Sequence, residues 1–142
     1  MENFRPTCFL GFDYGDKRIG IATAETLTRS ATPLMQIENN SDVWKAIEKL
    51  INQWKPEALI VGLPMSMDDT ESAQTKKARR FVKQLEVHTK LPVHTIDERL
   101  SSREARSRLG ESSRKTTKAD INSVAAQIIL ETWLTSKQIL TH

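Results

Sequence analysis

The sequence has a single cysteine, few aromatic residues (6%) and no long hydrophobic run. Cys8 alone cannot build a disulfide framework or a cysteine-ligated metal site. No apolar run approaches the ~20 residues that a membrane-spanning helix needs. Residues 1–6 lack the charged-then-apolar pattern of a signal peptide. We therefore expect a reducing, cytoplasmic setting and no membrane partner.

Two kinds of reactive site also lack their usual patterns. The three histidines, His88, His94 and His142, do not stand four residues apart as zinc-binding pairs on a helix do. No serine lies in a Gly-x-Ser-x-Gly motif. We expect structural or surface roles for the histidines, and the sequence gives no support for serine-nucleophile chemistry.

Length and composition bound the architecture. A chain of 142 residues with 38% hydrophobic content is long enough for one domain, so we expect a single domain over residues 1–142. The excess of 21 Lys and Arg over 18 Asp and Glu gives a net charge of +3. This mild excess permits a polyanionic partner without requiring one.

The hydrophobic pattern predicts an α/β protein. We expect strands at 8–13, 18–24, 31–37, 58–62 and 93–98, and helices at 43–54, 70–89, 101–109 and 120–136. Asn40–Asp42 supply capping groups for the first helix, and Thr70 can cap the second. The first three strands pair most simply as an antiparallel meander, and the other two add in parallel through right-handed crossovers. The result is a mixed five-stranded sheet with helices on both faces.

Two carboxylates are expected at one edge of this sheet. Asp13 ends the first strand, Gly62 ends the fourth, and Asp97 and Glu98 end the last, so all lie at the carboxyl edge where α/β sheets bind ligands. The outer strands of this trio are roughly 10 Å apart. Glu98 is long enough to cross that gap, and Gly62 has no side chain to block it.

Converging carboxylates repel unless a cation lies between them, and their hard oxygens favour Mg²⁺ or Mn²⁺. The residues near Asp13 leave other interpretations open. A simple hairpin with a turn aspartate is an alternative for the segment around Asp13, and a surface turn in which Arg99 pairs with its own neighbours is an alternative for the segment around Glu98. Lys17 or Arg18 could neutralise Asp13 instead of a metal ion. Gly15 and Gly20 are expected to relax the backbone around the turn.

The second helix is strongly basic. Lys76, Arg80 and Lys83 share one face at spacings of three and four residues. A solvated helix face and a phosphate-contacting face both explain this pattern. The tryptophans, Trp44, Trp54 and Trp133, lie on apolar helix faces and are expected to pack in the core.

Several segments together resemble the YqgF/RuvX family of RNase H-like proteins, which is assigned to nucleolytic processing of pre-16S rRNA. They are Gly11–Ala22, Ile60–Met65, Arg80–Phe81, Asp97–Ser102 with Ala105, and Ala125–Leu130. The resemblance covers nearly the whole chain. It implies an RNase H-like fold, metal-dependent phosphodiester cleavage, and Asp13 and Glu98 as acids of the site.

The sequence departs from the family pattern in two places. Asn122 stands where the family usually has an aspartate, three residues before the Ala-Ala pair. An amide oxygen can ligate magnesium but adds no charge, so weaker metal affinity is expected. Asp120, two residues earlier, could swing into the site or cap the last helix. Asp69 and Ser72 replace glycines common in the family.

The sequence thus predicts a magnesium- or manganese-dependent nuclease for structured RNA, acting in ribosomal RNA maturation as a monomer or homodimer. Asp13, Glu98 and Asp120 are the expected catalytic residues, and Asp13, Glu98 and Asn122 the expected metal ligands. Lys17, Arg18, Arg80 and Arg99 are the expected substrate-binding residues.

Three alternatives remain beside this prediction. The same fold and metal chemistry serve Holliday-junction resolvases, which act on DNA. A catalytically silent nucleic-acid-binding module would bind RNA with strong salt dependence. An ATPase of the actin or sugar-kinase type needs two such domains, and this length supplies one.

Overall fold

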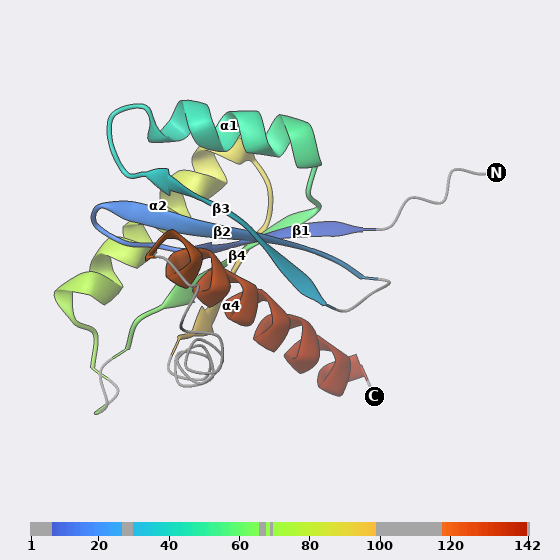
Figure 1. Cartoon of the computed structure of the whole chain (residues 1–142). Coiled ribbons are helices and arrows are strands. Elements are labelled where there is room, and N and C mark those ends of the chain that lie inside the picture. Colours follow the sequence, from blue (N-terminus) through green and yellow to red (C-terminus); the bar gives the residue numbers. More distant parts are fainter. Residues whose placement is uncertain (1–6, 27–29, 66–67, 69, 99–117, 142) are drawn as a thin grey trace.

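The computed structural model describes residues 7–26, 30–65, 68, 70–98 and 118–141, with side chains of the last helix described for 121–136. The described elements are five strands and three helices (Figure 1). The strands are β1 (Cys8–Asp13), β2 (Arg18–Glu25), β3 (Ala31–Glu38), β4 (Ala58–Leu63) and β5 (Val93–Asp97). The helices are α1 (Val43–Trp54), α2 (Ala73–Thr89) and α4 (Lys118–Thr141).

The strands form one mixed sheet in the order β3-β2-β1-β4-β5. β1 pairs with β2, and β2 with β3, in antiparallel register, whereas β4 lies parallel to both β1 and β5. This confirms the predicted meander followed by two parallel crossovers. The carboxyl ends of β1, β4 and β5 therefore share one edge of the sheet.

Helices cover both faces of the sheet, as expected. α1 and α2 pack on one face over apolar side chains that include Leu10, Phe12 and Val61. α4 crosses the opposite face over a second apolar cluster that includes Phe9 and Ile60 (Figure 1). The alternation of side chains along β1 explains this division, because odd and even residues of a strand point to opposite faces.

α4 lies close to the sheet because the sheet residues beneath the helix include glycines, which have no side chains. A Cβ atom placed on Gly11 would lie 3.1 Å from the Ala126 carbonyl oxygen, and one on Gly20 only 2.1 Å from the Asn122 carbonyl oxygen. None of the described glycines has a positive φ. The expectation that Gly20 relaxes a turn is therefore wrong: the position needs a missing side chain rather than a special backbone angle.

The expected helix ends need three corrections. The Asp42 side chain makes no capping bond to α1; instead, the Asn40 side-chain oxygen accepts the Asp42 N–H at 2.9 Å. α2 is capped by Ser72 and not by Thr70, whose hydroxyl donates to Asp68 at 2.6 Å. α4 begins at Lys118, so Asp120 lies inside the helix and is not its N-cap.

The tryptophans pack as predicted. Trp133 is buried and contacts Phe9 edge-on, with ring centroids 5.2 Å apart, and Trp44 stacks on His88 at 4.1 Å. The predicted helix at 101–109 and the polar segment that follows it to residue 117 lie outside the described residues. Among the described helices, none is both long and apolar enough to cross a membrane.

Candidate acidic site at the carboxyl edge of the sheet

The structure brings Asp13 and Glu98 together on the α4 face of the sheet. Asp13 pairs with Gly20, whose missing side chain faces α4, so Asp13 points to that face too. Ile96 pairs with Gly62 and packs into the cluster beneath α4. Glu98 follows Ile96 by two residues and so returns to the same side.

Gly62 makes the approach of the two acids possible. A Cβ atom at Gly62 would lie 3.6 Å from Glu98 Cγ, so the Glu98 side chain passes directly over the glycine. The Glu98 backbone N–H donates to the Leu63 carbonyl at 2.8 Å, which fixes the residue just beyond the end of β5. Asp97 pairs with Leu63 and falls on the alternate register, so Glu98 rather than Asp97 is the acid that meets Asp13.

The two carboxyl groups are hydrogen-bonded to each other, and the pKa of Asp13 is raised well above its ordinary value of 3.8. Burial of the Asp13 carboxyl is the main cause, followed by the hydrogen bond and the charge of Glu98. A hydrogen bond between two carboxyl groups requires a proton on one of them. Without a bound cation the Asp13 carboxyl therefore favours its protonated form.

Asn122 lies beside this pair, on the first turns of α4. Its backbone sits directly over Gly20, the strand partner of Asp13. Its side-chain Nδ2 donates to Gln36 Oε1 on β3 at 2.8 Å. Asp120 lies two residues earlier in the same helix, and its side chain is outside the described part of the chain.

The donor set fits a divalent cation. The Asp13 carboxyl, whose pKa is raised beside Glu98, would ionise if a cation were bound between the two groups, and hard oxygen donors suit Mg²⁺ or Mn²⁺. Within the described residues no cluster of three or more acidic, histidine or cysteine side chains surrounds one point. Asn122 is the predicted third oxygen ligand, and its side-chain amide donates to Gln36 on β3.

The basic residues predicted to neutralise Asp13 or to bind substrate differ in their contacts and exposure. Arg18 Nε pairs with Glu38 at 3.3 Å and Asp13 faces Glu98, which counts against Arg18 among the alternatives for a partner that neutralises Asp13. Lys17 is exposed in the β1–β2 turn, and Arg80 is exposed on α2. Arg99 lies outside the described residues.

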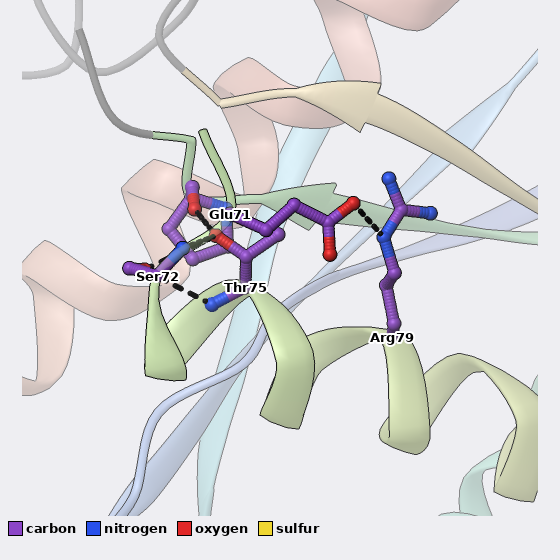
Figure 2. A network of polar contacts seen from close by, with 5 residues as sticks. Glu71, Ser72, Thr75 and Arg79 are labelled. Carbon is purple, nitrogen blue, oxygen red and sulfur yellow. Dashed lines mark hydrogen bonds and ion pairs between the residues drawn. The ribbon is translucent and has the colours of Figure 1, made fainter. Parts of the chain in front are cut away.

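Two loops next to the acidic pair are anchored to the start of α2. In the β1–β2 turn, Asp16 accepts a hydrogen bond from Gln74 at 2.9 Å and pairs with Lys77 at 3.2 Å. After β4, the hydroxyl of the fully buried Thr75 donates to the Pro64 carbonyl. Figure 2 shows these contacts of the second loop together with the Glu71–Arg79 ion pair, 2.7 Å long.

The anchoring residues were not predicted as part of the site. The capping box explains why Ser72 replaces a glycine: its hydroxyl accepts the Thr75 N–H at 3.3 Å, while Thr75 Oγ1 accepts the Ser72 N–H at 3.2 Å. The Ser-x-x-Thr spacing was the available signal. No local signal pointed to the partners of Asp16, because Gln74 and Lys77 lie 58 and 61 residues away in sequence.

Comparison with known proteins extends these observations. Residues 7–136 match the family model described as "RuvX: Holliday junction resolvase". A Legionella pneumophila (strain Lens) protein named "Putative pre-16S rRNA nuclease" is 52% identical over 130 residues, covering 89% of this chain and 94% of the relative. A Nitrosococcus oceani protein of the same name is 46% identical over 142 residues, covering 97% and 93%.

Solved structures share the fold at low sequence identity. Thermus thermophilus RuvC in complex with a Holliday junction substrate superposes with a TM-score of 0.62 at 14% identity, covering 93% of this chain and 96% of the other. The yeast mitochondrial Holliday junction resolvase Ydc2 gives 0.59 at 11% identity, covering 94% and 80%. These likenesses establish an RNase H-like fold of the resolvase type. With the family model matching most of its length, the chain belongs to the RuvX (YqgF) family.

Proposed function

We propose that this protein is a divalent-metal-dependent nuclease that hydrolyses phosphodiester bonds in precursor 16S rRNA. The observation that carries the proposal is the hydrogen-bonded pair of Asp13 and Glu98 at the carboxyl edge of the sheet. The names of relatives at 46–52% identity favour RNA as the substrate. Such an enzyme would act in the cytoplasm, where ribosomal precursors are processed.

Asp13 and Glu98 would hold the cation, with the Asn122 side-chain oxygen as a neutral third ligand. A bound divalent ion supplies an activated water and stabilises charge on the phosphodiester. Asp13, whose pKa is raised, would give up its proton on binding, and the two carboxylates together would fix the geometry of the site. Binding should therefore release protons and strengthen as pH rises.

The surrounding residues would orient the substrate. Lys17, in the turn anchored by Asp16 to α2, is exposed and close in sequence to Asp13, so it can meet a phosphate beside the acidic pair. Arg18, whose guanidinium also contacts Glu38, and Arg99 are further candidates. Asp120 would contribute only if its carboxylate joins the pair from the start of α4.

The test is cleavage of a 5′-extended pre-16S rRNA fragment in Mg²⁺ or Mn²⁺. Wild type should cut it, and the single variants D13N and E98Q should lose at least about a hundredfold in rate, since each removes a charged ligand. The E48Q variant, which changes an exposed acid of α1 on the other face of the sheet, should keep wild-type activity. Equal rates for wild type and D13N would remove the proposal.

A second candidate substrate is a four-way DNA junction. The description of the matching family model favours it, although the superposed resolvase structures share only the fold. The same assay decides between the two when the junction and the RNA fragment compete. Symmetric cutting of the junction by a dimer, with the RNA left intact, would establish the resolvase activity instead.

A further inference from the structure

The solvent face of α2 carries five cations. They are Lys76, Lys77, Arg79, Arg80 and Lys83, and all are exposed. The opposite face of the helix is buried through Thr75, Ala78, Phe81 and Leu85. The cations are therefore held in place by the packing of the helix against the sheet.

Two of these cations already have acidic partners. Lys77 pairs with Asp16 at 3.2 Å, and Arg79 pairs with Glu71 at 2.7 Å (Figure 2). Both pairs tie loops beside the acidic site to the helix. Within the part of the chain that the structure describes, no acidic side chain forms an ion pair with Lys76, Arg80 or Lys83.

The three remaining cations form a row. Residues four and three positions apart lie on one side of a helix, so Lys76, Arg80 and Lys83 line up along α2 over roughly 10 Å. Lys76 stands in the first turn of α2, where the loop from Gly62 joins the helix. On a regular duplex the same length corresponds to about three phosphates of one strand.

We propose that Lys76, Arg80 and Lys83 form a phosphate track that binds the backbone of the RNA cleaved at the acidic pair. The proposal rests on the nuclease function proposed above and adds a second contact region to it, on the other face of the sheet. Three neighbouring cations repel one another, and an RNA backbone provides the matching row of negative charges. Contacts of this kind fix the position of the substrate without reading its sequence.

The track predicts a specific change in the salt dependence of binding. A labelled RNA hairpin with single-stranded flanks is titrated with protein in EDTA over a series of KCl concentrations. The variant K76Q/R80Q/K83Q should bind more weakly, and its slope of log K against log[KCl] should be less negative by about 2. Circular dichroism and thermal melting check that every variant is folded.

A matched control removes the same charge from α1. Lys45 and Lys49 are exposed on that helix, and Lys55 follows it with a left-handed φ of 49° that asparagine tolerates. The variant K45Q/K49Q/K55N should keep the wild-type slope. An unchanged slope in the track variant, or equal shifts in both variants, would overturn the proposal.

The experiment separates this proposal from the nuclease function. Binding in EDTA is measured without cleavage. If the protein shows no nuclease activity but the track variant still has a less negative slope of log K against log[KCl], the track is supported and the nuclease function is not. A four-way DNA junction serves as the second ligand. If the track variant weakened binding to the junction and left RNA binding unchanged, the assignment to RNA would be wrong.

Discussion

At the scale of single residues, the site depends on one buried carboxyl whose charge is disfavoured. Asp13 has a raised pKa because it is buried and faces Glu98. A carboxyl group with a raised pKa in the folded state favours folding most at low pH, and that advantage is lost as pH rises from the ordinary value of 3.8 through the raised one. At neutral pH the metal-free site therefore destabilises the fold.

The variant D13N tests this electrostatic penalty. Without metal at pH 7–8 it should melt above wild type by about 3–6 °C, or roughly 1 kcal/mol for a chain of this size. The difference should shrink as pH falls and vanish below about pH 3, where Asp13 is protonated in both the folded and the unfolded state. Mg²⁺ should stabilise wild type and not D13N. A D13N protein that melts lower than wild type at pH 7–8 would contradict this account.

The proposed role of Asn122 as a neutral metal ligand is open to a direct test. The variant N122D adds a third carboxylate beside Asp13 and should tighten Mg²⁺ binding about tenfold, measured by calorimetry or by thermal shift against Mg²⁺ concentration. The control N52D makes the same charge change on the exposed face of α1, away from the acidic pair, and should leave the Mg²⁺ affinity unchanged. Equal affinities for N122D and wild type would mean that Asn122 is not a ligand.

At the scale of elements, glycines set the distance between α4 and the sheet. A Cβ at Gly62 would lie 2.5 Å from Ile129 Cδ1, the flexible end of a side chain, whereas a Cβ at Gly20 meets the backbone of Asn122. G62A should cost about 1–3 kcal/mol in unfolding free energy, and the double variant G62A/I129V should recover most of it.

The comparison with Gly20 makes this prediction specific. A Cβ at Gly20 would meet the Asn122 backbone carbonyl, which no side-chain substitution removes, so I129V should not rescue G20A. Urea unfolding of the two double-variant cycles measures the coupling energies, which should be about 1 kcal/mol or more for Gly62 and near zero for Gly20. Additive effects in both cycles would show that Ile129 does not limit the space over Gly62.

The elements and their order were predictable from sequence because the apolar periodicities are strong and the connections allow few topologies. The convergence of Asp13 and Glu98 followed from the same topology, once Gly62 was recognised as a gap. The cap at Ser72 was missed because Thr70 and Ser72 offer similar side chains, although the Ser-x-x-Thr spacing of the capping box was a local signal for Ser72. The pairing of Arg18 with Glu38 depended on the β2–β3 register, which no local pattern encodes.

At the scale of the whole molecule, α2 and α4 pack on opposite faces of one sheet, and each places residues at the edge where the acidic pair lies. α4 brings Asn122 over Gly20 beside the acidic pair, while α2 holds the two loops that border it. The shared edge of β1, β4 and β5 is where these contributions meet. The central claim is that Asp13 and Glu98 bind one divalent cation at this edge.

The most direct measurement is anomalous diffraction from crystals grown with Mn²⁺. We predict an anomalous peak between Asp13 and Glu98, about 2.1 Å from a carboxylate oxygen of each, with the direct hydrogen bond between the two groups broken. Crystals at millimolar Mn²⁺ that show no peak there, with the carboxyl groups still hydrogen-bonded to each other, would contradict the account.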